Sequence, residues 1–173
     1  MSQKNDKQPQ YLGLEKVSMD SAFRGKLASA LAGTRMYGAF SDHDLTRLFD
    51  YLEAFRAEKG SAIFVEDEKA GYMCLVVEGL LHIIKESPSG KSKKLTEVGQ
   101  GQSIGEMSII DGMPHSATAI AAQATTVAVL TKENLLKLLQ DYPQIAGKIF
   151  CNIAEYLSRR LRETSGELIA YKD

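Results

Sequence analysis

Residues 104–118 read IGEMSIIDGMPHSAT, and the pattern predicts one short helix between two strands. Gly105 and Glu106 follow the end of the first strand, residues 107–110 make a single helical turn, and an Asp-Gly pair closes it. A helix in this place exposes unpaired N–H groups at its N-terminus, and such groups can bind an anion. The stretch is therefore a candidate ligand site as well as a turn.

Short runs rich in β-branched residues flank this stretch on both sides, over about residues 55–131. They are separated by Gly, Pro, Asp and Ser, and examples are SAIFV, YMCLVV, LLHII and TTVAVL. Many short strands with frequent turns are typical of a sandwich or barrel. No long helical pattern interrupts them, which argues against a doubly wound fold. We predict a mainly β fold with flanking α-helices.

Helical periodicity is found at the two ends of the chain. In the N-terminal part, residues 20–35 contain one predicted helix, and Ser41 with Asp44 forms a near capping box at the start of a second. Residues 1–19 are rich in Gln, Lys, Asn and Ser and show no periodicity, so we predict a flexible tail.

C-terminal helices are predicted over about residues 132–169, with Thr131 as the first cap and a longer helix opening near Pro143. One apolar stripe of the long helix repeats by four and three: Phe150, Ala154, Leu157, Leu161, Thr164 and Leu168. Ile145, Ile149, Ile153 and Tyr156 make a second stripe. One stripe could pack on the β body and the other on a second copy. The alternative is a single wide face directed at the core.

Composition excludes several classes of protein. The chain has 173 residues, 44% of them hydrophobic, and a net charge of -1, which indicate one ordinary globular domain without the basic excess of most nucleic-acid binders. No apolar stretch is long enough for a membrane span or a signal peptide. Cys74 and Cys151 lie in apolar runs and are predicted to be buried, reduced thiols of a cytoplasmic protein. We expect no metal site and no catalytic residues, because the isolated histidines lack partners.

The residues around the short helix have the chemistry of a sugar-phosphate site. Gly105 allows close approach of a ligand, Glu106 can accept a hydrogen bond from a sugar hydroxyl, and His115 and Ser116 return to the same place as donors. Ribose plus phosphate would fit these groups. On the residues alone, a tight turn inside a β-sandwich is the favoured interpretation.

The order of motifs resembles the cyclic nucleotide-binding domain family over about residues 36–169. FVEDEKAGYMCLVVEGLL is similar to the family's hairpin, and GQGQSIGEMSIIDGMPHSATAIA is similar to its phosphate-binding segment. TKENLLKLLQDYPQIAGKIFCNIAEYLSRRLRETSGEL is similar to the family's B helix and long C helix, most closely as in bacterial catabolite activator proteins. The resemblance implies a jelly-roll-like β-roll of eight strands, two N-terminal helices, a long C-terminal helix and a domain spanning residues 36–173. It also implies binding of cAMP or cGMP without catalysis.

The resemblance implies a role for each site residue. Gly105 and Glu106 would hold the ribose hydroxyl, and Ser116 with nearby N–H groups would bind the cyclic phosphate. Thr164 and Ser165 match the pair that contacts adenine, which favours cAMP. The full candidate ligand-binding set is Gly105, Glu106, Met107, His115, Ser116, Thr164 and Ser165.

The chain departs from the family at two positions. His115 stands where the family has a phosphate-binding Arg, which predicts weaker binding, because imidazole makes one contact and is mostly neutral at pH 7. Asp67 stands where the family has a Gly after a strand, which predicts a changed turn. A helix-turn-helix module follows the long helix in the activator proteins but not here, so we expect this chain alone not to read DNA.

Two hypotheses follow from this comparison. The first is a stand-alone cytoplasmic sensor that binds a cyclic nucleotide and signals through its C-terminal helix, as a homodimer or to a protein partner. The second is a degenerate domain without a nucleotide ligand that serves as a dimerisation or protein-docking module. Neither hypothesis includes a cofactor, a membrane contact or direct DNA binding.

Overall fold

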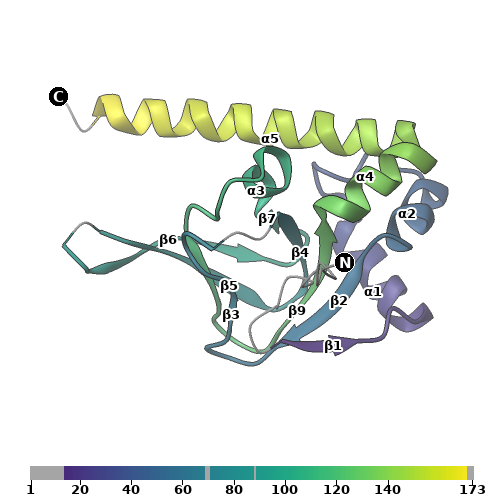
Figure 1. Cartoon of the computed structure of the whole chain (residues 1–173), viewed down its shortest axis with the longest axis horizontal. Coiled ribbons are helices and arrows are strands. Elements are labelled where there is room, and N and C mark those ends of the chain that lie inside the picture. Colours follow the sequence, from purple (N-terminus) through teal and green to yellow (C-terminus); the bar gives the residue numbers. More distant parts are fainter. Residues whose placement is uncertain (1–13, 69–70, 88, 171–173) are drawn as a thin grey trace, which may run out of the picture.

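The computed structural model describes residues 14–68, 71–87 and 89–170, without the side chains of residues 167–170. Within these ranges two antiparallel sheets form the body, one ordered β1-β2-β9-β4-β7 and the other β3-β8-β5-β6 (Figure 1). The strands are β1 (Glu15–Val17), β2 (Glu53–Ala57), β3 (Ala62–Phe64), β4 (Tyr72–Glu78), β5 (Leu80–Glu86), β6 (Ser92–Gly99), β7 (Ser103–Ile104), β8 (Thr118–Ala121) and β9 (Thr125–Thr131). The helices are α1 (Ser21–Leu31), α2 (Asp42–Phe49), α3 (Glu106–Asp111), α4 (Lys132–Asp141) and α5 (Pro143–Ala170).

The predicted architecture is confirmed. Strands β2 to β9 form the eight-stranded roll, with two helices before it and a long helix after it. The expectation of a flexible tail over residues 1–19 is wrong at its end, because β1 pairs antiparallel with β2. This pairing gives hydrogen-bond partners to backbone N–H and C=O groups on the outer edge of β2. The Lys16 ammonium also lies 3.0 Å from the Glu53 carboxylate. Residues 1–13 of the expected tail lie outside the described ranges.

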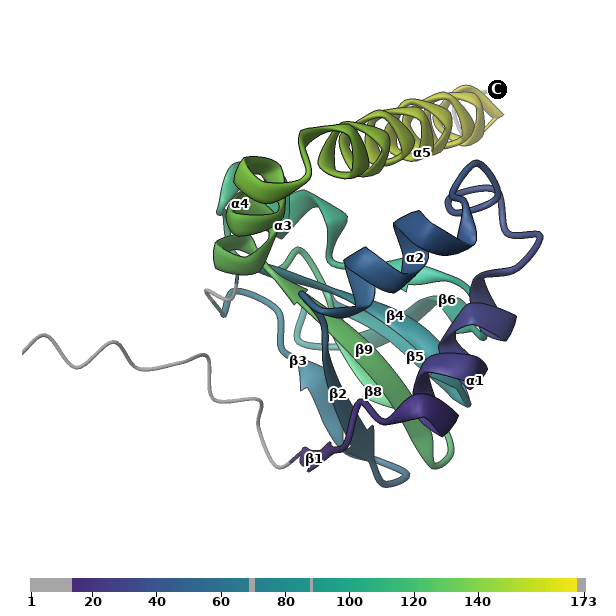
Figure 2. The same ribbon diagram turned by 90° about the vertical axis from the view of Figure 1, so that its right-hand side faces the viewer.

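Strand β4 separates two hydrophobic cores. Its side chains alternate between the two faces, as a period of two requires. Met73, Leu75 and Val77 pack with the helices, whereas Cys74 and Val76 pack between the two sheets. Both faces of β4 are buried, which explains its unbroken apolar sequence. Figure 2 shows α1, α2, α4 and α5 around the helical side of this sheet.

The helix starts follow the local signals in the sequence. The Ser41 hydroxyl accepts from the Asp44 N–H at 3.2 Å, and the Asp44 carboxylate accepts from the Ser41 N–H at 3.0 Å, which completes the capping box. Thr131 caps α4 in the same way, by accepting from the Asn134 N–H at 3.1 Å. α4 ends at Asp141, and Pro143 begins α5.

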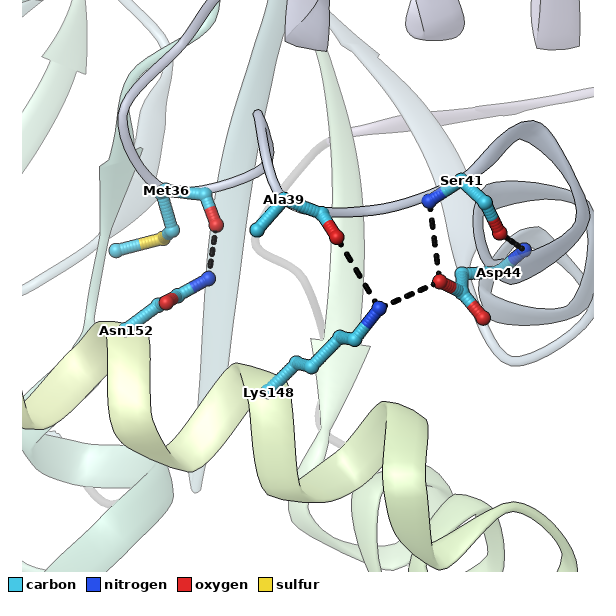
Figure 3. Close-up of polar contacts among 6 residues, drawn as sticks. All are labelled: Met36, Ala39, Ser41, Asp44, Lys148 and Asn152. Carbon is cyan, nitrogen blue, oxygen red and sulfur yellow. Dashed lines mark hydrogen bonds and ion pairs between the residues drawn. The ribbon is translucent and has the colours of Figure 1, made fainter.

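The α1–α2 connection, residues 32–41, is tied to α5 by polar contacts (Figure 3). Asn152 donates to the Met36 carbonyl, and the Lys148 ammonium donates to the Ala39 carbonyl at 3.1 Å and to the Asp44 carboxylate at 2.8 Å. The Lys148 and Ser41 hydrogen bonds together lower the pKa of Asp44 to about 2. These contacts fix the connection beside the N-terminal half of α5.

The two apolar stripes of α5 have different surroundings. Ile145, Ile149 and Ile153 are buried against the helical core, whereas Leu161 of the other stripe is 68% exposed. Leu168 lies outside the described side chains. Cys74 is buried as expected, but Cys151 is exposed, because its position on α5 faces away from the core. No helix of the described ranges is both long and apolar enough to cross a membrane.

Candidate functional site

A cavity of about 500 Å³ lies between the β-roll and α5, and we call it the α5 cavity. The segment from Ile104 to Ala117 supplies one side of it. Five residues of α5 supply the facing wall: Tyr156, Leu157, Arg160, Leu161 and Thr164. The volume suits a small organic ligand, and the lining combines apolar side chains with a few polar groups.

Gly105 is the N-cap of α3 and has a left-handed backbone, with φ +86°. A Cβ at this position would lie 2.7 Å from the Tyr72 carbonyl oxygen and 3.3 Å from the His115 ring. Only glycine therefore lets β7 turn into α3 with β4 directly behind it. The turn places the first residue of α3 at the cavity wall.

Glu106 carries the buried carboxylate of the site, at 5% exposure. The Ser103 hydroxyl donates to this carboxylate. Burial raises the pKa of Glu106, and the Ser103 hydrogen bond and the Arg160 charge oppose that rise. A buried carboxylate with one hydroxyl donor has further acceptor positions, so it can receive a ligand hydroxyl.

His115 packs its ring against two aromatic side chains. It stacks on Phe64 at 3.8 Å between centroids, and the Tyr72 ring lies edge-on at 5.1 Å. Burial lowers the pKa of His115 to about 4, so the imidazole is neutral at pH 7. Its Nε2 atom is buried and lacks a hydrogen-bond partner among the described residues. A buried polar atom beside a cavity is a group that a ligand can satisfy.

The turn that carries His115 is also fixed through its backbone. The His115 carbonyl accepts from the Asp67 N–H at 2.9 Å, and the His115 N–H donates to the Glu68 carbonyl at 3.2 Å. Asp67 has φ +66°, the left-handed region that glycine adopts most easily. Asp67 therefore keeps the conformation that a glycine would give this turn, at some cost in backbone strain.

Two further predicted residues, Ser116 and Met107, also line the α5 cavity. The Ser116 carbonyl accepts from the Lys85 ammonium at 2.7 Å, so a positive charge lies close behind the His115–Ser116 turn. Met107 is 54% exposed and lies at the rim.

The structure separates Thr164 from Ser165. Thr164 lines the α5 cavity, but Ser165 does not, and the Ser165 hydroxyl donates to the Leu161 carbonyl at 2.8 Å. Consecutive residues of a helix point about 100° apart, and Ser165 lies on the side of Thr164 that is turned away from the cavity. The structure therefore brings six of the seven predicted residues to the α5 cavity, and Ser165 is not among its lining.

Sequence reasoning missed Arg160, Tyr156 and Phe64, which all line the cavity. The Arg160 guanidinium donates to the Tyr156 hydroxyl at 3.3 Å. Helical spacing from Thr164 could have indicated Arg160, because residues four apart share a helix face. Phe64 had no local signal, because its strand reaches the site only through the pairing of β3 with β8.

Comparison with known proteins gives one family. The model of the "Cyclic nucleotide-binding domain" family matches residues 54–142, half of the chain. The "Cyclic AMP receptor protein" of Thermus thermophilus is 28% identical over 138 residues, which are 80% of this chain and 62% of that protein. This chain thus spans about three fifths of the length of that relative.

Many solved structures are similar in fold. A cyclic nucleotide-binding domain from Methylobacillus flagellatus superposes with a TM-score of 0.82 at 27% identity, covering 95% of this chain and 92% of that one. The Thermus thermophilus catabolite activator protein gives a TM-score of 0.73 at 26% identity, covering 80% of this chain and 63% of that one. The similarity to the first includes almost the whole of both chains.

Proposed function

The chain belongs to the cyclic nucleotide-binding domain family, and from that premise we propose that it is a regulatory sensor whose α5 cavity binds cAMP. The Thermus thermophilus relative is named for cyclic AMP, which supports this choice of nucleotide. The proposal includes no catalytic step. Signalling would pass through α5, which forms one wall of the cavity.

The observation that carries the proposal is an open cavity with two polar groups at its wall that a ligand can engage. Glu106 has free acceptor capacity, and the His115 Nε2 atom lacks a partner among the described residues. A ribose hydroxyl would donate to Glu106, and an oxygen of the cyclic phosphate would accept from His115 if the proton is on Nε2. A degenerate domain would be expected to fill this space with its own side chains.

Arg160 offers a positive charge that the family provides from another position. It lines the cavity, and its charge already acts on Glu106. We infer that Arg160 stabilises the bound phosphate and partly offsets the replacement of the family Arg by His115. Thr164 lines the same cavity one helical turn beyond Arg160, and its hydroxyl would contact the base.

Dimerisation through α5 is part of the proposal. Leu161 and Ala154 of the outer stripe are exposed, and a second copy of α5 would cover them. Pairing of this kind would place Ser165 of one subunit beside the other subunit, which gives that residue a role that it lacks within one chain. Analytical ultracentrifugation with and without cAMP measures this, and a monomer under both conditions would remove this part of the proposal.

The binding test is isothermal titration of the chain with cAMP, cGMP and cyclic di-GMP at pH 6 and pH 8. We expect cAMP to bind most tightly, and Glu106→Gln to weaken it about tenfold or more, because a hydrogen bond to a charged acceptor contributes about 1.5–3 kcal/mol. Glu133→Gln, which makes the same change at an exposed glutamate of α4 outside the cavity, is the matched control. No heat and no thermal stabilisation at millimolar nucleotide would exclude the sensor function.

A variant that should bind cAMP more tightly tests whether position 115 faces the phosphate. His115→Arg restores a permanent charge and two donors toward the phosphate, so cAMP affinity should rise about ten- to a hundredfold. The Phe64 ring that now stacks on His115 can also stack on a guanidinium. An unchanged titration curve with a correctly folded variant would mean that position 115 does not face the phosphate.

A further inference from the structure

Lys85, on β5, joins two turns of the β-roll that lie far apart in the sequence. Its ammonium group donates to the Glu66 carboxylate at 2.5 Å and to the Ser116 carbonyl at 2.7 Å. Glu66 follows β3 and Ser116 precedes β8, and these two strands are neighbours in one sheet. We call Lys85, Glu66 and Ser116 the lysine clamp. Of the three, Ser116 lines the α5 cavity, so the clamp holds the cavity wall from outside.

The carboxylate of the lysine clamp is itself held in place. The second Glu66 oxygen accepts from the Glu86 N–H at 3.2 Å, and the Glu66 N–H donates to the Thr118 hydroxyl at 3.0 Å. The Lys85 and Glu86 hydrogen bonds lower the pKa of Glu66, so the carboxylate is ionised at pH 7. An ion pair that belongs to a network keeps its geometry better than an isolated surface pair. Lys85 is therefore oriented before any ligand binds.

The Ser116 carbonyl belongs to the same peptide unit as the Ala117 N–H. This peptide is trans, so the N–H points away from the Lys85 ammonium. Ala117 is 8% exposed and lines the α5 cavity, and no described residue accepts a hydrogen bond from its N–H. A cation on the carbonyl oxygen polarises the peptide and strengthens the N–H as a donor. Lys85 thus acts on an unpaired backbone donor of the cavity wall.

The charge of Lys85 also lies close to the cavity. An anion that accepts from the Ala117 N–H would lie no more than about 8 Å from the Lys85 Nζ atom, because two hydrogen bonds and one peptide unit separate them. Lys93 lies opposite Lys85 in the register of β5 and β6, and cross-strand partners share a face of the hairpin. Lys93 has no ion pair with a described side chain, so its positive charge is uncompensated.

We propose that Lys85 is a positioning residue for the phosphate of the bound nucleotide, acting through the Ser116–Ala117 peptide and through its permanent charge. This inference rests on the proposed function, because the phosphate is that of the cyclic nucleotide. Arg160 offers its charge from α5, on the facing wall, whereas Lys85 offers its charge from the β-roll. An anion in the α5 cavity would therefore lie between positive charges on two sides, although position 115 carries no arginine.

The test is isothermal titration of cAMP into wild type and three variants at low salt. Lys85→Met should raise the dissociation constant about three- to thirtyfold, which is the effect of one charge about 8 Å away at an effective dielectric constant between about 60 and 20. Lys85→Arg should restore most of the affinity, because a guanidinium can donate to both acceptors of the clamp. Lys94→Met is the matched control, since it removes a hairpin lysine that pairs with Glu97 at 2.7 Å, and it should change the constant less than about twofold.

Two further measurements separate positioning of the phosphate from a general loss of structure. At about 1 M NaCl the Debye length is about 3 Å, so the difference in affinity between wild type and Lys85→Met should shrink. In the free chain, the amide ¹⁵N signal of Ala117 should shift in Lys85→Met but not in Lys94→Met, because only the first variant removes the cation from that peptide. The remaining amide signals show whether each variant is folded.

Three results would overturn the inference. The first is equal cAMP affinity in wild type and in folded Lys85→Met, and the second is an unchanged Ala117 signal in that variant. The third is a loss of affinity that is the same at both salt concentrations, because Lys85 would then have a structural role only. Failure of the proposed function is distinguishable, since the wild-type chain would then bind no cAMP at either salt concentration, and the inference would be excluded with it.

Discussion

Lowering the pH should destabilise the fold through His115, which is buried as a neutral ring. Burial lowers the pKa of His115 to about 4, whereas a histidine in an unfolded chain has a pKa of about 6.5. The unfolded chain therefore binds a proton between these values and the folded chain does not. The contribution of His115 to the free energy of unfolding is fully present above pH 6.5 and declines as the pH falls to 4. A difference of about 2.5 pKa units corresponds to about 3 kcal/mol of free energy of unfolding.

The assay is urea unfolding followed by circular dichroism between pH 7.5 and pH 4.5. The free energy of unfolding of wild type minus that of His115→Gln should fall by up to about 1.4 kcal/mol per pH unit below pH 6. His43→Gln, which removes an exposed histidine at the start of α2, is the control for the loss of an imidazole. A difference for His115→Gln that does not change with pH would refute the reasoning that the buried ring resists protonation.

Saturating cAMP should reduce this dependence on pH. A phosphate beside Nε2 favours the protonated ring and raises its pKa toward the value of the unfolded chain. Binding should then take up a fraction of a proton near pH 5, measurable as a buffer-dependent binding enthalpy. An enthalpy that is independent of the buffer would mean that the phosphate does not lie beside His115.

Three further perturbations test other parts of the fold. Gly105→Ala should lower the free energy of unfolding by about 1–3 kcal/mol, because φ is +86° and the Cβ would lie 2.7 Å from a backbone oxygen of β4; an unchanged urea midpoint would contradict the strained turn. Lys148→Met should cost about 1 kcal/mol at pH 7, and the cost should shrink as the pH falls toward 2 and Asp44 takes up its proton; a cost that does not change between pH 7 and pH 2 would contradict the ion pair. A thiol reagent should modify Cys151 quickly and Cys74 only on unfolding, and two equally fast thiols would contradict the burial described for β4.

Local signals in the sequence predicted the elements well. Ser41 and Asp44 alone indicated the start of α2, because they form its capping box. The Gly105–Glu106 pair indicated the start of α3 within one turn. The mainly β body and the order of the helices that flank it followed from hydrophobic period and turn residues. Each of these features depends on neighbours in the sequence, which a single sequence displays.

Features that depend on distant partners were not predictable in the same way. Strand β1 has a polar sequence and forms only because the edge of β2 is available to it. The His115 Nε2 atom is buried because the β-roll packs Phe64 and Tyr72 against the imidazole ring, and both residues are distant from His115 in the sequence. The sequence showed two apolar stripes on α5 but not which of them faces the core. Cys151 belongs to neither stripe, and the apolar run around it suggested a burial that its position on the helix does not give.

The contacts at Met36 and Ala39 hold only the first part of α5 in place. Asn152 and Lys148 anchor the first part, and the 28-residue helix continues well past that anchor to Ala170. Residues 153–170 span about 27 Å. A tilt of about 10° at the anchor would carry the end of the helix about 5 Å. Under the proposed function, a small adjustment of α5 beside a bound nucleotide would thus become a displacement that a second protein could detect.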